Sequence, residues 1–311
     1  MKKGLKITLF AVGSFLGLVA LDLGVSLIYN KANEATNTHE LESSFNKIKI
    51  DVSTSDVEII KANDGKGKVV CKETKKIKHD VKVEDETLNI NFNYKYRFSL
   101  FMFTPSFKVQ VYVPSNVEYE LNSTSSTGEF EVGSDLVFTN VNSQITTGNL
   151  SIASNVKNEV KIKLTTGDVS LSKMSPNSIN IDTSTGKIEL KDIGCSGDIE
   201  LKSSTGSKYL ENLTSKNLTT TSSTGDLKLK KVVLSEKLKA TTTTGKIKLS
   251  ESDAEEVDIK TTTGDVDAEF LSDKIVYAKT STGDVDVPKS TTGGLCSIET
   301  TTGDIKVTIK K

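Results

Sequence analysis

The sequence predicts an all-β protein wound as a β-helix, a solenoid whose coils are 19–20 residues long. Three observations predict it: a Thr-Gly phrase that recurs at a nearly fixed interval, apolar columns on both sides of that glycine, and no helical period within the repeat. The ten glycines are Gly128, Gly148, Gly167, Gly186, Gly206, Gly225, Gly245, Gly264, Gly283 and Gly303, at intervals of 19 or 20 residues. A period this regular is typical of repeats that each form one structural turn and stack on their neighbours.

The apolar columns define the expected core of the solenoid, which we place in residues 121–311. Seven residues before the glycines stand Leu121, Val141, Val160, Ile179, Ile199, Leu218, Leu238, Val257, Val276 and Cys296. Four residues after them stand Val132, Ile152, Leu171, Leu190, Leu210, Leu229, Leu249, Ala268, Val287 and Val307. Polar residues alternate with these columns, which predicts strands with one buried face. Two residues after the glycine the residue is again apolar, with Lys208 as the exception.

The Thr-Gly pair itself is predicted to be a corner. Glycine suits a sharp bend that needs a positive φ or close approach of a neighbouring coil, and threonine suits a strand end. We expect the last residues, including Lys306, Lys310 and Lys311, to place positive charge at the open C-terminal edge and discourage end-to-end pairing.

Residues 45–120 are predicted to form an N-terminal β cap on this solenoid. Short alternating runs indicate strands, and Ser53-Thr54-Ser55-Asp56-Val57 looks like a degenerate copy of the repeat. Residues 94–107 hold a concentration of aromatic side chains, which suit a cover for the open end of the core. The alternative is an exposed interaction patch that touches a membrane or a partner protein, formed by Phe98, Leu100, Phe101, Met102 and Phe103.

The first 29 residues are expected to be a short cytoplasmic tail and a transmembrane signal-anchor. Lys2, Lys3 and Lys6 precede a mostly apolar run, Ile7–Ile28, and about 20 apolar residues suffice to span a bilayer. By the positive-inside rule the C-terminal domain would lie outside the cell on a single-pass protein of the cell membrane. We favour this anchor over a cleaved signal peptide, because the run is long and no cleavage site is evident.

Residues 30–44 are polar with no strand pattern and are expected to be a flexible spacer. Asp22 is a carboxylate within the apolar run, which is costly in a bilayer. Its expected place is near the outer leaflet, although it could also contact a second membrane helix.

Catalytic chemistry has little support in the sequence. The formal net charge is −1, the chain has one arginine, Arg97, and its two histidines, His39 and His79, precede the solenoid. Cys71, Cys195 and Cys296 lack the paired spacing of a zinc or redox motif. We therefore expect neither an enzyme, nor a bound cofactor, nor a nucleic-acid partner.

The residue after each glycine forms a column that offers a weak candidate site for calcium. Asp265, Asp284 and Asp304 occupy the last three copies, so stacking would place three carboxylates about 4.8 Å apart. A hard cation would relieve their repulsion. In the simpler interpretation, which we favour, each aspartate accepts backbone N–H groups of its turn and no metal is needed.

The repeated Thr-Gly-Asp-Val phrase, as in residues 166–169, 263–266 and 282–285, resembles the bacterial putative-adhesin domain family of β-strand-repeat proteins of unknown function. The resemblance covers residues 45 to the C-terminus. It implies a right-handed, single-stranded β-helix exposed on the surface of a Gram-positive cell, and no catalytic residues.

Two functions follow as hypotheses. The first is an adhesin-like binding or scaffold protein that engages an envelope polymer or a partner protein through the solenoid face or the aromatic segment. The alternative is a cell-envelope stress sensor, which would need a membrane signalling partner because so little of the chain is cytoplasmic.

Overall fold

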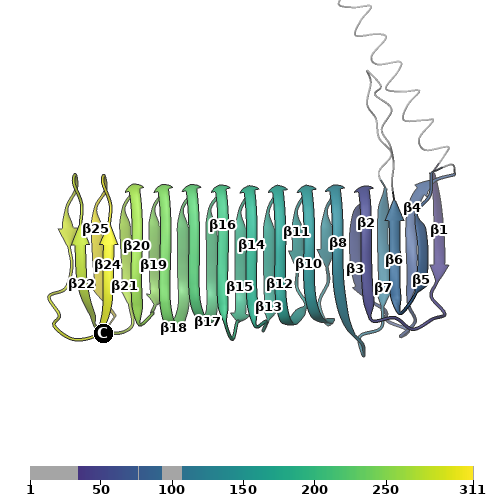
Figure 1. Cartoon of the computed structure of the whole chain (residues 1–311), viewed down its shortest axis with the longest axis horizontal. Coiled ribbons are helices and arrows are strands. Elements are labelled where there is room, and N and C mark those ends of the chain that lie inside the picture. The colour runs from purple at the N-terminus through teal and green to yellow at the C-terminus, as the bar shows by residue number, and fades with distance from the viewer. Residues whose placement is uncertain (1–33, 76, 93–106, 311) are drawn as a thin grey trace, which may run out of the picture.

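The computed structural model describes residues 34–75, 77–92 and 107–310, and these form one β-solenoid (Figure 1). All regular elements in these ranges are strands, arranged as two facing walls. One wall contains β6 (Thr87–Phe92), β2 (Lys47–Thr54), β8 (Glu118–Thr127), β10 (Val137–Thr147), β12 (Asn155–Thr166), β14 (Ser178–Thr185), β16 (Asp198–Thr205), β20 (Glu256–Thr263), β24 (Gly294–Glu299) and β22 (Lys274–Lys279). The other contains β7 (Lys108–Val113), β3 (Asp56–Lys61), β9 (Phe130–Val132), β11 (Leu150–Ile152), β13 (Val169–Met174), β15 (Ile188–Gly194), β19 (Ile247–Ser252), β21 (Val266–Phe270), β25 (Ile305–Ile309) and β23 (Val285–Asp286). β17 (Lys208–Thr224) and β18 (Leu227–Thr244) each run from the second wall into the first wall of the next coil.

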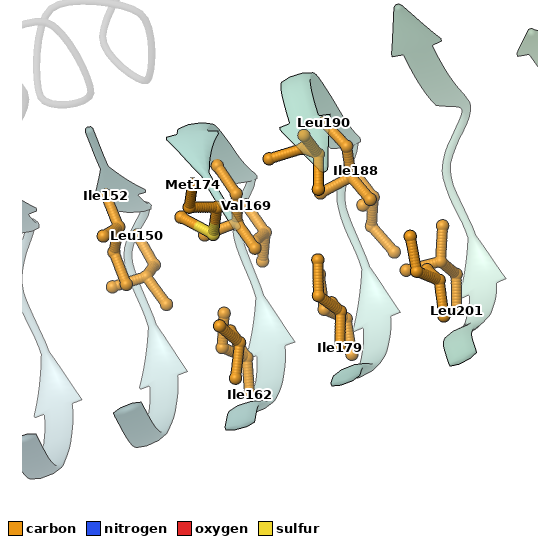
Figure 2. Packing of buried hydrophobic residues seen from close by; sticks show 14 of the residues in the cluster. Leu150, Ile152, Ile162, Val169, Met174, Ile179, Ile188, Leu190 and Leu201 are labelled. Atoms are coloured by element: carbon orange, nitrogen blue, oxygen red, sulfur yellow. The ribbon is translucent and has the colours of Figure 1, made fainter. Parts of the chain in front are cut away.

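The coils stack in parallel and in register, which confirms the predicted β-solenoid. Val160 pairs with Ile179, Ile179 with Ile199, and Ile199 with Leu218, so that each column holds equivalent residues of successive coils. These residues are fully buried. Figure 2 shows how apolar side chains from the two walls meet in the narrow interior and repeat along the stack.

The structure confirms the predicted reason for a glycine at each of these corners. The ten repeat glycines have φ between 134° and 156°, a region that side chains with a Cβ rarely adopt. A Cβ added to Gly186 would lie 1.8 Å from the carbonyl oxygen of Gly167 in the coil below. Both the backbone conformation and the close stacking therefore require glycine here.

A second corner was not predicted. Lys173, Asp192, Asn212, Lys231 and Glu251 have φ between 49° and 58°, and they follow one another at the repeat period. This is the left-handed helical region, which polar residues enter at modest cost. The residue types differ from coil to coil, so the sequence shows no column at this position.

At the N-terminal end the coils do not follow sequence order. The coil of β2 and β3 lies between β6 and β7 on one side and β8 and β9 on the other (Figure 1). Gly128 stacks on Ser55 as it would on a glycine, which confirms the degenerate repeat copy predicted at residues 53–57. The region predicted as a cap thus contributes complete coils to the stack.

Antiparallel strands close this end. β1 (Glu34–Glu40) pairs with β4 (Lys68–Thr74), β4 pairs with β7, and β5 (Asp80–Glu84) pairs with β6. The expectation that residues 30–44 lack a strand was wrong, because β1 lies within them. Its inward positions are Ala35, Asn37 and His39, so it has no apolar alternation by which the strand could be recognised.

The C-terminal end repeats the arrangement. β24 and β25 lie between the coil of β20 and β21 and the coil of β22 and β23, so the last residues of the chain are enclosed and the preceding coil is outermost. The predicted role of Lys306 and Lys310 at the open edge was therefore wrong. The outermost coil exposes Tyr277 and Val285 instead.

No helix in the described ranges is long and apolar enough to cross a membrane. The predicted signal-anchor, residues 1–29 with Asp22, lies outside the described residues.

Candidate functional site

The aromatic interaction patch proposed from the sequence lies outside the described residues. Phe98, Leu100, Phe101, Met102 and Phe103 all fall in residues 93–106.

The aspartate column after the corner glycines has a structural role. Asp304 Oδ1 accepts the backbone N–H of Asp284 at 2.9 Å, and Asp265 Oδ1 accepts that of Asp304 at 3.2 Å. Asn149 makes the same contact to Asp168 N–H at 2.8 Å without a charge. Along the stack the order is Asp265, Asp304, Asp284, because the last coil is enclosed between two others. The Asp265 and Asp304 carboxylates act as acceptors of backbone hydrogen bonds. This favours the simpler interpretation over calcium.

Charge in this column is balanced by a lysine. Lys246 Nζ lies 2.8 Å from Asp265 Oδ2, and this hydrogen bond is the main cause that lowers the pKa of the Asp265 carboxyl. Both side chains are largely solvent-exposed, so the pair adds little stability.

The outer surface of the first wall carries a shallow hollow of about 310 Å³. Its lining combines carboxylates, an amide, a hydroxyl and amines from three adjacent coils: Asp198, Glu200, Asn217, Thr219, Lys237 and Lys239. Asn217 Nδ2 donates to Asp198 Oδ1 at 2.8 Å, and the backbone N–H of Lys237 donates to Asn217 Oδ1 at 3.1 Å. The hollow is therefore polar and held in place by contacts between coils.

A buried lysine interrupts the apolar interior. Lys208 is 2% exposed, and its Nζ donates to Ser203 Oγ at 2.5 Å and to the carbonyl oxygen of Thr221 at 3.2 Å. Burial lowers the pKa of this amine to about 8. The sequence had marked Lys208 as the exception in its column but gave no hint that the amine would point inward.

The N-terminal end encloses a second polar cluster, which sequence reasoning missed. Cys71, Glu73 and His79 are each at least 96% buried, and their potential ligand atoms lie within 4.8 Å of one another. His79 Nδ1 lies 2.9 Å from Glu73 Oε2, and His79 Nε2 lies 3.1 Å from Ser55 Oγ. No recognised motif spacing links residues 55, 71, 73 and 79. They meet because β4 and the segment before β5 fold over the N-terminal end, next to the corner at Ser55.

This cluster resembles a Ser-His-Glu catalytic triad in its contacts but not in its access. The His79 ring stacks on Phe92 with centroids 4.2 Å apart, and Phe107 covers its edge. Burial is the main cause that lowers the pKa of His79, and burial raises the pKa of the Cys71 thiol to about 12. A neutral, enclosed thiol is a poor nucleophile, and a triad serine needs a site for substrate beside it.

The protein is a β-solenoid in which Cys71, Glu73, His79 and Lys208 are buried and the polar hollow of the first wall is open to solvent. The chain belongs to the Toastrack DUF4097 family, whose model matches residues 45–206 and 194–311. This confirms the family resemblance drawn from the repeat.

Solved structures of similar proteins come from bacteria. A "putative adhesin" from Bacteroides fragilis is 15% identical, with 88% of this chain and 96% of that chain covered and a TM-score of 0.43. A "putative lipid binding protein" from Parabacteroides distasonis is 14% identical, with coverage of 86% and 97% and a TM-score of 0.49. A "putative cell adhesion protein" from Clostridium sporogenes is 13% identical, with coverage of 89% and 100% and a TM-score of 0.35. A search of curated proteins finds no match.

Proposed function

We propose that this protein is a non-enzymatic, membrane-anchored scaffold on the outside of the cell, with an adhesin-like binding role. The observation that carries the proposal is the open polar hollow on the first wall, where Asp198, Glu200, Asn217, Thr219, Lys237 and Lys239 face solvent from stacked coils. Such a set offers both donors and acceptors, which suits a hydroxylated polymer of the cell envelope.

The regular stacking supports this role because it repeats similar outward positions along the rod. A polymer with a regular repeat can contact several coils at once, and weak contacts then add up through multivalency. The anchor in this proposal is residues 1–29, which would hold the solenoid at the membrane surface.

The test is retention of the full chain, in detergent, on purified envelope polysaccharide. Thr219→Arg fills the hollow with a bulky cation and is expected to reduce retention at least about tenfold, which corresponds to roughly 1.4 kcal/mol. Ser151→Arg, at a half-buried position on the opposite wall, is the matched control and should bind as the unmodified chain does. Equal retention of both variants, or no retention of the unmodified chain, would contradict the proposal.

A chain that lacks residues 1–30 separates this function from envelope-stress sensing. A scaffold keeps its polymer without the anchor, whereas a sensor that acts through a membrane partner loses every partner with it. Loss of all binding in this variant would favour the sensor.

A further inference from the structure

One hydrogen-bond arrangement of the buried N-terminal cluster leaves a place for a cation between His79 and Glu73. Ser55 Oγ lies 2.8 Å from the carbonyl oxygen of Thr54, to which it donates its single hydrogen. When it does so, the contact between Ser55 Oγ and His79 Nε2 at 3.1 Å has Nε2 as the donor.

With the hydrogen on Nε2, neutral His79 presents a bare lone pair at Nδ1. That lone pair faces Glu73 Oε2 at 2.9 Å, an oxygen that already accepts the backbone N–H of His79 at 2.7 Å. Two acceptors this close need a proton or a cation between them. Asn37 Nδ2 donates to the other carboxylate oxygen, so the carboxylate is oriented from both sides.

The third group of the cluster distinguishes a cation from a proton. Cys71 Sγ lies within 4.8 Å of the Glu73 and His79 ligand atoms, and a shared proton would need no sulfur beside it. Cys71 and Glu73 are two residues apart on β4, so both side chains point to the inner face of that strand, and His79 reaches the same point from the chain that follows.

We propose that Cys71, Glu73 and His79 bind a zinc ion that closes the N-terminal end of the solenoid. Sulfur, imidazole nitrogen and carboxylate oxygen are the donor types that Zn²⁺ prefers, and three protein ligands leave a fourth position for water or a further side chain. The donation from His79 Nε2–H to Ser55 Oγ is the outer contact that fixes the tautomer in zinc-binding histidines. The thiol proton of Cys71 leaves to solvent when the thiolate binds the metal.

A second imidazole, that of His39, lies at the same end of the solenoid. His39 lies two residues along β1 from Asn37, which pairs directly with Cys71, and within the described part of the chain its buried Nε2 has no hydrogen-bond partner. His39 also lines a surface hollow of about 300 Å³ with Leu41, Val81 and Val83.

The experiment uses the full chain in detergent, stripped with a chelator and titrated with zinc alone against a chromophoric chelator. We expect one zinc per chain and a rise in melting temperature on zinc addition. Cys71→Ser and His79→Gln should each weaken zinc affinity by at least about 100-fold. Cys296→Ser is the matched control, because Cys296 is equally buried in the solenoid interior, and it should bind zinc as the unmodified chain does.

Cobalt substitution needs no variant and therefore covers the case in which the Cys71 or His79 variant fails to fold. Cobalt bound by a thiolate gives a strong near-ultraviolet charge-transfer band, which should appear with one equivalent of Co²⁺ and disappear on adding zinc. The proposal would be overturned if the thiolate band did not appear and zinc did not bind stoichiometrically. A proton shared by His79 and Glu73 would then explain their contact. Unchanged zinc affinity in a folded Cys71→Ser variant would overturn it as well.

Discussion

Lys208 is the residue whose burial costs the solenoid most clearly. Its amine has hydrogen-bond acceptors in Ser203 Oγ and Thr221 O, but these oxygens carry no full charge to compensate the ammonium. Desolvation therefore disfavours the charged form, which is why the pKa falls from 10.5 to about 8. A shift of this size corresponds to roughly 3 kcal/mol of destabilisation while the amine is charged.

We expect Lys208→Met to raise the free energy of unfolding by about 1–3 kcal/mol at about pH 7, because an apolar side chain replaces a buried cation. The folded state releases its proton near pH 8 and the unfolded chain near 10.5, so the unfolded chain binds more protons between these values. Stability of the unmodified chain therefore rises with pH across this window, and the advantage of the variant shrinks.

Urea unfolding at about pH 7 and about pH 10 measures both effects. Lys228→Met, at an exposed position of the next coil, is the control and should change stability little at either pH. An advantage of Lys208→Met that stays constant with pH would show that the amine is not the cause.

At the scale of the element, the residue after the glycine accepts a backbone hydrogen bond from the adjacent coil at several corners. A side-chain Oδ1 atom accepts a backbone N–H of an adjacent coil at Asp168, Asp226, Asp265 and Asp304. The amide oxygen of Asn149 makes the same contact without a charge. Where this position carries an acceptor, an uncharged oxygen serves as well as a carboxylate.

Asp304→Asn is accordingly expected to leave stability within about 0.5 kcal/mol, whereas Asp304→Leu removes the acceptor for Asp284 N–H and should cost about 0.5–1.5 kcal/mol. Chemical denaturation measures the difference between the two variants. Millimolar calcium added to chelator-stripped protein should leave the melting temperature unchanged; a rise that Asp304→Asn abolishes would restore calcium to the column.

The elements themselves were predictable where the sequence carries a period. Alternating apolar residues gave the strands, and the fixed interval of the glycines gave the coil, because stacking repeats the same backbone requirement in every copy. Strand β1 escaped prediction because its inward side chains are Ala35, Asn37 and His39. The left-handed corner at Lys173 and its equivalents escaped because several polar residues tolerate that conformation.

The candidate sites were less predictable from the sequence than the strands and coils. The sequence identified the aspartate column and named Lys208 as an exception, but it could not show which way either side chain points. The Cys71, Glu73 and His79 cluster depends on antiparallel strands that fold back over one end, and no local spacing reports such a contact. The hollow around Thr219 combines residues from three coils whose outward positions share no pattern.

For the whole molecule, the order of coils at the two ends is the main departure from expectation. Val276 and Cys296 occupy the same column, so exchanging the places of the last two coils leaves their inward residues inward. The apolar pattern is therefore compatible both with stacking in sequence order and with the observed order. Only the structure shows that Val276 is outermost and Cys296 fully buried.

We predict that backbone amides of β24 and β25 exchange with solvent more slowly than those of β22 and β23, although they lie nearer the chain end. β24 has a paired strand on each side, whereas β22, among the strands that the structure describes, pairs only with β24. Hydrogen exchange read by mass spectrometry on peptides of 274–287 and 294–309 measures this. Faster exchange in the terminal peptide would indicate that the coils stack in sequence order.

The enclosed final coil also bears on how the chain is made. A solenoid stacked in sequence order could grow coil by coil as the polypeptide emerges, each turn settling on the one before. Here residues 294–309 occupy a place between two coils synthesised earlier, so the outermost coil reaches its final position only after the last residues exist. Completion of this end therefore depends on residues 294–309, and a chain that lacks them leaves the coil of residues 274–286 without its neighbour.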